Sequence, residues 1–164
     1  MLLPGRRAVA VILALSLGGQ PVLFGEEEQY SAEDVGRLLT ERRYHDLQPV
    51  LQRIERQWAA EVDKENSPLN RYDWARTLHS LGAIEKKIGL ADEAVKHLRL
   101  ARDLTLEGKF NEFDPPVVLA ELLDNLGLAE TAAGHYREAE QSLKAEKLRV
   151  KLLRSELADA DGAT

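Results

Sequence analysis

The sequence contains no cysteine among its 164 residues. A chain without cysteine has no disulfide bond, no lipid-modified cysteine and no thiolate to share a zinc ion with histidine. The four histidines, His45, His79, His97 and His135, lie singly along the chain, and none belongs to an H-E-x-x-H motif. We therefore expect packing alone to stabilise the fold, and we expect no metal site.

Positive charge is also scarce, because 22 lysines and arginines face 28 aspartates and glutamates, which gives a formal net charge of −6. Non-specific binding to nucleic acid needs Lys and Arg to replace counterions, and docking on anionic lipid needs a basic patch. The chain also has no G-x-x-x-x-G-K-[ST] phosphate loop and no G-x-S-x-G elbow. We expect a protein that is not an enzyme, holds no cofactor and has no nucleic-acid partner.

Long apolar runs are missing except near the N-terminus. Two arginines at positions 6–7 precede the apolar residues 8–17, the glycines 18–19 follow, and then come the glutamates 26–28. This order predicts a signal peptide over residues 1–25 and an exported protein, periplasmic or extracellular. An uncleaved N-terminal anchor is the alternative, although the apolar run falls short of the roughly 20 residues that a spanning helix needs.

The chain repeats itself with an offset of 45 residues. Nine of the 24 positions from 75 to 98 carry the same residue 45 positions later, whereas about two identities would arise by chance. The identical pairs are Ala75/Ala120, Leu78/Leu123, Leu81/Leu126, Gly82/Gly127, Glu85/Glu130, Gly89/Gly134, Glu93/Glu138, Ala94/Ala139 and Leu98/Leu143. The repeat is the strongest signal in the sequence.

Each repeat unit has the spacing of two helices joined by a tight turn. Leu78, Leu81 and Glu85 stand at i, i+3 and i+7, and Ala94, Leu98 and Ala101 stand at i, i+4 and i+7; both spacings are typical of amphipathic helices. Gly89 and Gly134 are expected to end the first helix of each unit, because glycine adopts the left-handed conformation at little cost. We expect the Glu85 and Glu130 side chains to be polar positions on helix surfaces.

Two further glycines, Gly82 and Gly127, lie inside the predicted first helices. A glycine in a helix costs about 1 kcal/mol relative to alanine, so its presence at both equivalent positions needs a reason. We expect the partner helix to approach closely at these points, with the small residues Ala94 and Ala139 facing the glycines.

This pattern resembles the tetratricopeptide repeat: Leu-Gly, a glycine seven residues on, an alanine five later and a large apolar residue four later. It reads Leu81-Gly82, Gly89, Ala94 and Leu98, and again Leu126-Gly127, Gly134, Ala139 and Leu143. The units are similar to the longer version found in kinesin light chains. A degenerate copy lies 47 residues upstream, where Tyr44, Leu47, Leu51 and Ile54 keep the spacing of the second helix and both glycines are missing.

The resemblance implies an all-α fold over residues 31–157, a short right-handed superhelix (α-solenoid) of about three helix-turn-helix pairs. Residues 158–164 are expected to form a flexible tail. Start and stop signals predict six helices. The starting caps are Ser31, Asp46 with Pro49 in the first turn, Ser67-Pro68 and Asp114-Pro115; Gly108 is a stop, and the last helix runs from Tyr136 to Leu157.

The resemblance also implies a concave groove lined by the first helix of each pair. Its candidate binding residues are Arg76, His79, Lys86 and Lys87 in the middle unit and Asp124 and Asn125 in the last. An amide such as Asn125 can both donate to and accept from an extended peptide, and the basic residues could hold a carboxylate. We expect a protein–protein interaction module that binds a protein or peptide; the alternative for these residues is a solvated helix surface.

A self-associating scaffold is the alternative function. In that case the exposed end helices would join copies of the chain into a homo-oligomer, through an uncovered stripe of leucines on the last helix. The residues of that stripe are Leu143, Leu152, Leu153 and Leu157.

Overall fold

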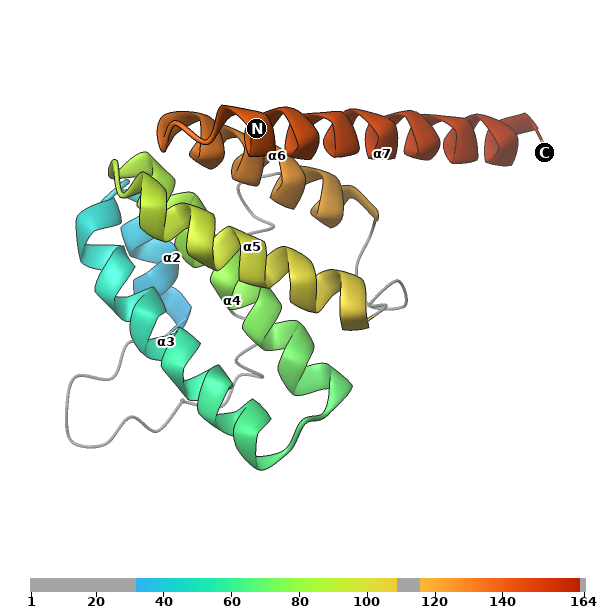
Figure 1. Cartoon of the computed structure of the whole chain (residues 1–164). Coiled ribbons are helices and arrows are strands. Elements are labelled where there is room, and N and C mark those ends of the chain that lie inside the picture. The colour runs from blue at the N-terminus through green and yellow to red at the C-terminus, as the bar shows by residue number, and fades with distance from the viewer. Residues whose placement is uncertain (1–31, 109–115, 163–164) are drawn as a thin grey trace.

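The computed structural model describes residues 32–108 and 116–162 (Figure 1). Its helices are α2 (Ala32–Thr40), α3 (Tyr44–Lys64), α4 (Pro68–Lys87), α5 (Ala91–Gly108), α6 (Pro116–Ala132) and α7 (Tyr136–Gly162). These residues contain no strand, so the prediction of an all-α fold is confirmed. The predicted signal peptide and the cap at Asp114-Pro115 lie outside the described residues. No helix within them is long and apolar enough to cross a membrane.

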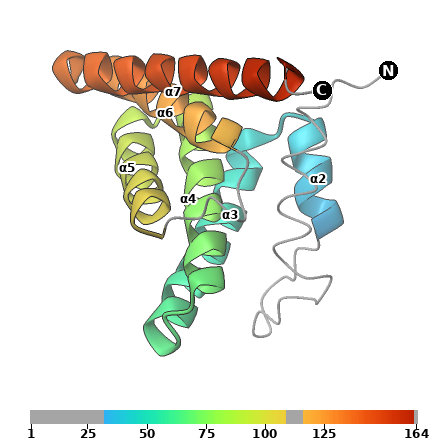
Figure 2. The same ribbon diagram turned by 90° about the vertical axis from the view of Figure 1, so that its right-hand side faces the viewer.

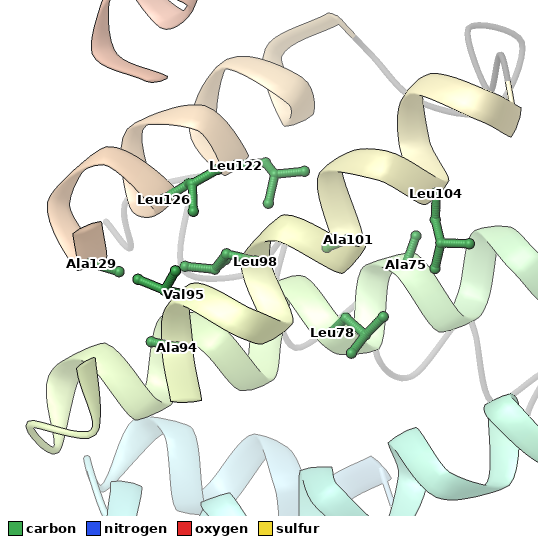
Figure 3. Close-up of a cluster of buried hydrophobic side chains, with 10 residues drawn as sticks. All are labelled: Ala75, Leu78, Ala94, Val95, Leu98, Ala101, Leu104, Leu122, Leu126 and Ala129. Atoms are coloured by element: carbon green, nitrogen blue, oxygen red, sulfur yellow. The ribbon is translucent and has the colours of Figure 1, made fainter. Parts of the chain in front are cut away.

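Each helix packs against the next one along the chain, and α4 also contacts α6. Helix α4 lies between α5 on one side and α2 and α3 on the other (Figure 2). It can fill this place because it is apolar on two faces. Ala75 and Leu78 face a core shared with α5 and α6 (Figure 3), whereas Leu81 and Ile84 join a core with α2 and α3. Neighbouring helix pairs therefore cover one another's apolar surfaces.

The start of α4 follows the sequence prediction, and the start of α3 does not. Ser67 caps α4, because its hydroxyl accepts from the Asn70 amide at 3.1 Å. Helix α3 begins at Tyr44, two residues before the predicted cap Asp46, and Pro49 lies inside it. The reason is the turn before α3: the carbonyl of Arg43 already accepts from the Leu47 amide at 3.0 Å, which starts the helix early.

The predicted turns at Gly89 and Gly134 are confirmed. Their φ angles are 85° and 79°, in the left-handed region that glycine tolerates best. In each turn the next amide, that of Leu90 or His135, donates to the carbonyl oxygen five residues earlier, at 2.9 and 2.8 Å. This is the Schellman arrangement, which closes a helix by satisfying its last carbonyl groups.

The upstream helix pair uses the same turn without a glycine. Arg42, 47 residues before Gly89, has a φ of 58°, and the Arg43 amide donates to the Leu38 carbonyl at 2.9 Å. A residue with a Cβ atom pays about 1–2 kcal/mol for this conformation. The degenerate copy thus has the same local turn geometry as the two clearer units.

We expect Arg42→Gly to raise the free energy of unfolding by roughly 0.5–1 kcal/mol, because relief of the left-handed strain exceeds the entropy that glycine adds to the unfolded chain. The Arg42 side chain is exposed, so little packing is lost. Urea denaturation measures the change. Arg42→Ala is the control, since alanine keeps the Cβ atom; equal unfolding midpoints for the two variants would contradict the explanation.

The glycines inside α4 and α6 face the backbone carbonyl oxygens of the predicted alanines, Ala94 and Ala139, and each also meets a leucine side chain. A methyl group added at Gly82 would lie 2.5 Å from Cγ of Leu98 and 3.2 Å from the carbonyl oxygen of Ala94. At Gly127 it would lie 2.6 Å from Cγ of Leu143. Close approach of the partner helix is therefore confirmed at both sites, and a leucine side chain lies over the glycine in each.

The end of α7 also differs from the prediction. The helix continues to Gly162 rather than ending at Leu157, because residues 158–162 include two alanines, the best helix formers, before the glycine. The flexibility expected of residues 158–164 stays a prediction. Helix α5 ends at Gly108 as predicted, and α7 extends past α6 at its C-terminal end (Figure 1).

Candidate functional site

Three of the predicted binding residues meet in a hydrogen-bonded chain between α4 and α6. The Lys86 ammonium group donates to Oδ1 of Asn125 at 2.7 Å, and Nδ2 of Asn125 lies 3.1 Å from Nε2 of His79. The repeat offset brings them together, because α4 and α6 are the first helices of consecutive units and lie against one another. Asn125 therefore connects the two helices through both ends of its amide.

The charge state of His79 fits its role as the acceptor in this chain. Burial, together with the positive charges of Arg76 and Lys86, lowers the pKa of His79 from 6.5 to about 4. At neutral pH the ring is uncharged, so its Nε2 atom accepts from the Asn125 amide. All hydrogen bonds then point in one direction: the Lys86 ammonium group donates to the Asn125 amide, which donates to the His79 imidazole.

Lys86 experiences opposing influences. Burial lowers the pKa of its ammonium group, and Lys87 acts in the same direction, whereas the carboxylates of Asp124 and Glu121 on α6 raise it. Asp124 is exposed and acts on Lys86 through its charge. The surface around Lys86 therefore combines one partly buried cation with acidic groups on the neighbouring helix.

The two remaining predicted residues lie on α4 but contact other side chains. Arg76 hydrogen-bonds the Tyr72 hydroxyl group, and its guanidinium carbon lies 5.3 Å from the centre of the Tyr72 ring. The Lys87 ammonium group lies 5.5 Å from the centre of the Tyr44 ring on α3. Such cation–π contacts hold both cations at aromatic faces, so the four basic and polar residues of the middle unit do not converge on one point.

The hydrogen-bonded side chains of Lys86 and Asn125 still have donors and an acceptor with which they can contact a ligand. The Lys86 ammonium group has three N–H bonds and uses one on Asn125, while the amide group has one further donor and one further acceptor position. The arrangement therefore offers both donors and an acceptor within a few ångströms. An extended backbone, which both donates and accepts, can use this combination, whereas a carboxylate group can use only the donors.

The two repeated glutamates were mispredicted as surface residues. Glu85 and Glu130 are 0% and 1% exposed. Oε2 of Glu85 lies 2.6 Å from Nδ1 of His97 on α5, and its Oε1 is buried without a hydrogen-bond partner among the described residues. A buried carboxylate is costly unless it is paired, so the position is structurally demanding.

Glu130 has a fuller set of partners. Its Oε1 accepts from Nε and one terminal nitrogen of Arg99 at 3.0 and 2.8 Å, and its Oε2 accepts from the Ser142 hydroxyl group at 2.8 Å. Ser142 follows His97 by 45 residues, so the two glutamates bond to equivalent positions on α5 and α7. A signal was available in the sequence: both glutamates stand on the same i, i+3, i+7 stripe as buried leucines.

The outer side of α7 differs in character from the equivalent side of α5. Val95 of α5 is buried in the core shared with α6 (Figure 3). Arg99, four residues later on α5, reaches Glu130 of α6. The residues 45 positions later are Glu140 and Lys144, which are exposed and form an ion pair with each other at 2.6 Å. The packing surface of α5 is thus replaced by a charged surface on α7.

The predicted leucine stripe of α7 is only partly present. Leu143 lies over Gly127 in the contact with α6, so its assignment to an uncovered stripe was wrong. Leu152 is exposed, and so is Leu148, which the prediction omitted. The side chains of Leu153 and Leu157 are outside the described part of the structure.

Comparison with known proteins identifies no relative: no family model, no curated protein and no solved structure matches the chain. Within residues 32–108 and 116–162, no group of three or more His, Asp or Glu side chains could hold a metal ion.

Proposed function

We propose that this chain is a tetratricopeptide-like interaction module, exported by its N-terminal segment, that binds an extended peptide or protein segment. In this proposal the helix pairs form a short right-handed superhelix, and the ligand lies along the concave side made by the first helices α4 and α6. Three features support it: the equivalent turns at Gly89 and Gly134, the close helix approach at Gly82 and Gly127, and the packing of each helix pair on the next.

The observation that carries the proposal is the chain of hydrogen bonds from Lys86 through Asn125 to His79. It positions an amide between the two first helices, where an extended backbone crossing from one to the other would meet it. Polar groups of a few kinds, placed by packed helices, are what fix the orientation of a bound ligand.

Charge suggests which ligands fit. Lys86 and Arg76 make the α4 part of the surface basic, whereas Asp124 and Glu121 make the α6 part acidic. A segment with an acidic side chain over α4 and a basic one over α6 would match both parts. Such complementarity selects partners and their orientation more than it adds affinity.

Selection of peptides from a random display library with the purified protein tests the proposal. We expect enriched peptides, measured by fluorescence anisotropy, to bind Asn125→Ala and Lys86→Glu at least about tenfold more weakly, which corresponds to about 1.4 kcal/mol for hydrogen bonds to amide or charged groups. Lys147→Glu is the matched control, because it makes the same charge change at an exposed residue of α7. The proposal is wrong if no peptide is enriched, or if all three variants bind the enriched peptides equally.

The scaffold alternative has a weaker basis in the described residues. Exposed Leu148 and Leu152 on α7 favour it, but the ion pair Glu140–Lys144 occupies the side of α7 on which another helix pair would stack. Desolvating two exposed charges opposes such stacking. Light scattering distinguishes the two functions, since a scaffold requires an oligomer at micromolar concentration and the module proposed here works as a monomer.

A further inference from the structure

A buried carboxylate joins α4 to α5 through a partner that can lose its charge. Glu85 is fully buried, and the imidazole of His97 on α5 supplies its hydrogen bond at 2.6 Å. Histidine changes charge in the physiological pH range. Above the pKa of His97, the carboxylate therefore keeps a hydrogen bond from a neutral ring but has no cationic partner there, and its second oxygen is already buried without a partner among the described residues.

The equivalent contact one unit later is different in this respect. Glu130 is held by Arg99, which stays protonated at every pH at which proteins fold, and by the hydroxyl of Ser142. The two buried glutamates stand 45 residues apart, at equivalent positions near the C-terminal ends of α4 and α6. Each buried glutamate therefore bonds to the helix that follows it, but only Glu130 also has a permanent cation, which Arg99 supplies from the preceding helix α5.

The charges around His97 favour its protonated form. The hydrogen bond that His97 donates to Glu85 on α4 raises the pKa of His97 above 6.5, and burial opposes this. The charges of Glu85 and of Glu55 on α3 raise the pKa further, while Lys96 on α5 itself lowers it. No charged residue of α6 within the described part contributes to this balance. Two carboxylates on two different helices thus face one imidazole that is partly open to water.

We propose that the contact between α4 and α5 is a proton-responsive joint. Protonation of His97 gives the buried Glu85 carboxylate a cationic partner and tightens the helix pair, and loss of that proton loosens it. This response to pH is a property separate from ligand binding. It acts next to the candidate binding surface, because Lys86 of that surface directly follows Glu85 in α4.

The direction of the effect follows from the sign of the shift. Because folding raises the pKa of His97, the stabilisation is complete below pH 6.5 and is lost as the pH rises through the raised pKa. Each unit by which the pKa is raised changes the unfolding equilibrium constant by about tenfold. The protein is therefore expected to unfold at progressively lower urea concentrations as the pH is raised from about 6 to about 9.

Two substitutions at the joint test the proposal in urea titrations across this pH range. His97→Gln keeps a side-chain donor but does not titrate, and Glu85→Gln removes the carboxylate at nearly constant shape. Both variants should show a clearly flatter dependence of the unfolding midpoint on pH than the unaltered chain. His45→Gln is the control, since His45 is exposed, and its pH profile should follow that of the unaltered chain.

Nuclear magnetic resonance of the unaltered chain provides a second readout that does not depend on folding of the variants. Titration of the His97 ring protons should give a pKa above 6.5, the ordinary value for histidine. The proposal is overturned if the pKa of His97 is at or below 6.5, or if His97→Gln retains the full pH dependence of the unfolding midpoint.

Discussion

Replacement of Arg99 by methionine is expected to lower the free energy of unfolding by about 3 kcal/mol, the lower end of the cost of removing one partner from a buried ion pair. Methionine keeps the packing of the aliphatic stem and removes the charge. Among the residues that the structure describes, Glu130, which is 1% exposed, would then keep only the Ser142 hydroxyl group as a hydrogen-bond partner. The lower end of the range is appropriate because the Arg99 side chain is itself 37% exposed and water can reach it.

Urea denaturation with a matched substitution isolates the role of the buried charge. Arg102→Met on the same helix removes an arginine whose ion pair is with exposed Asp103, and it should change stability by no more than about 0.5 kcal/mol. A second variant, Arg99→Met with Glu130→Leu, should recover much of the loss. The first helix pair shows that a leucine fits at this position, because Leu38 occupies the position equivalent to Glu130 and is buried there. Equal losses in Arg99→Met and Arg102→Met would refute the explanation.

The second large effect is expected at the glycine inside α4. We expect Gly82→Ala to destabilise the protein by about 2 kcal/mol, since overpacking costs up to about 3 kcal/mol and the better helix propensity of alanine returns about 1. The new methyl group would overlap Cγ of Leu98, which can move only if the whole buried side chain turns about χ1, and would approach the Ala94 carbonyl oxygen. In an exposed helix without such a neighbour, the same substitution would stabilise.

A double-mutant cycle that combines Gly82→Ala with Leu98→Ala tests this cause. Leu98→Ala alone should cost about 2–5 kcal/mol by leaving a cavity in the core, but the methyl group introduced by Gly82→Ala would fill part of that cavity. The double variant should therefore be more stable than the sum of the two single changes predicts. Strict additivity would show that the Leu98 contact is not what excludes a side chain at position 82. The same cycle can be repeated at Gly127 and Leu143.

Much of the fold was predictable because it depends on local chemistry repeated at a fixed offset. The periodic leucines placed the helices, and the glycines at 89 and 134 marked their turns, since few other residues adopt a left-handed conformation cheaply. Arg42 shows the limit of this reasoning. It occupies the same conformation without the residue type that would have revealed it, because the surrounding helices hold the turn in place.

The buried glutamates could not be assigned from residue type, because glutamate is usually exposed. Their burial depends on partners that lie 12 and 31 residues away in the sequence, such as His97 and Arg99. Position gave a better indication than polarity: Glu85 shares its helix face with Leu78 and Leu81, both of which are fully buried. A polar residue repeated on an apolar stripe indicates a buried hydrogen-bonded pair.

The sequence predicted only part of how the side chains of the candidate site are arranged. The offset between units brought Lys86 and Asn125 within hydrogen-bonding distance, which a repeat pattern can indicate. It could not indicate that Lys87 and Arg76 lie against the rings of Tyr44 and Tyr72. Those contacts depend on the rotamers of long side chains, which sequence periodicity does not determine.

The ion pair Glu140–Lys144 has a consequence for engineering. An additional helix pair joined to the C-terminal end of α7 would meet two charges where the interior junction offers a valine and an arginine. Lengthening the protein by copying its middle unit would therefore require Glu140→Val and Lys144→Arg before the new junction could exclude water. In this way the two exposed charges oppose the packing of a further helix pair against this side of α7.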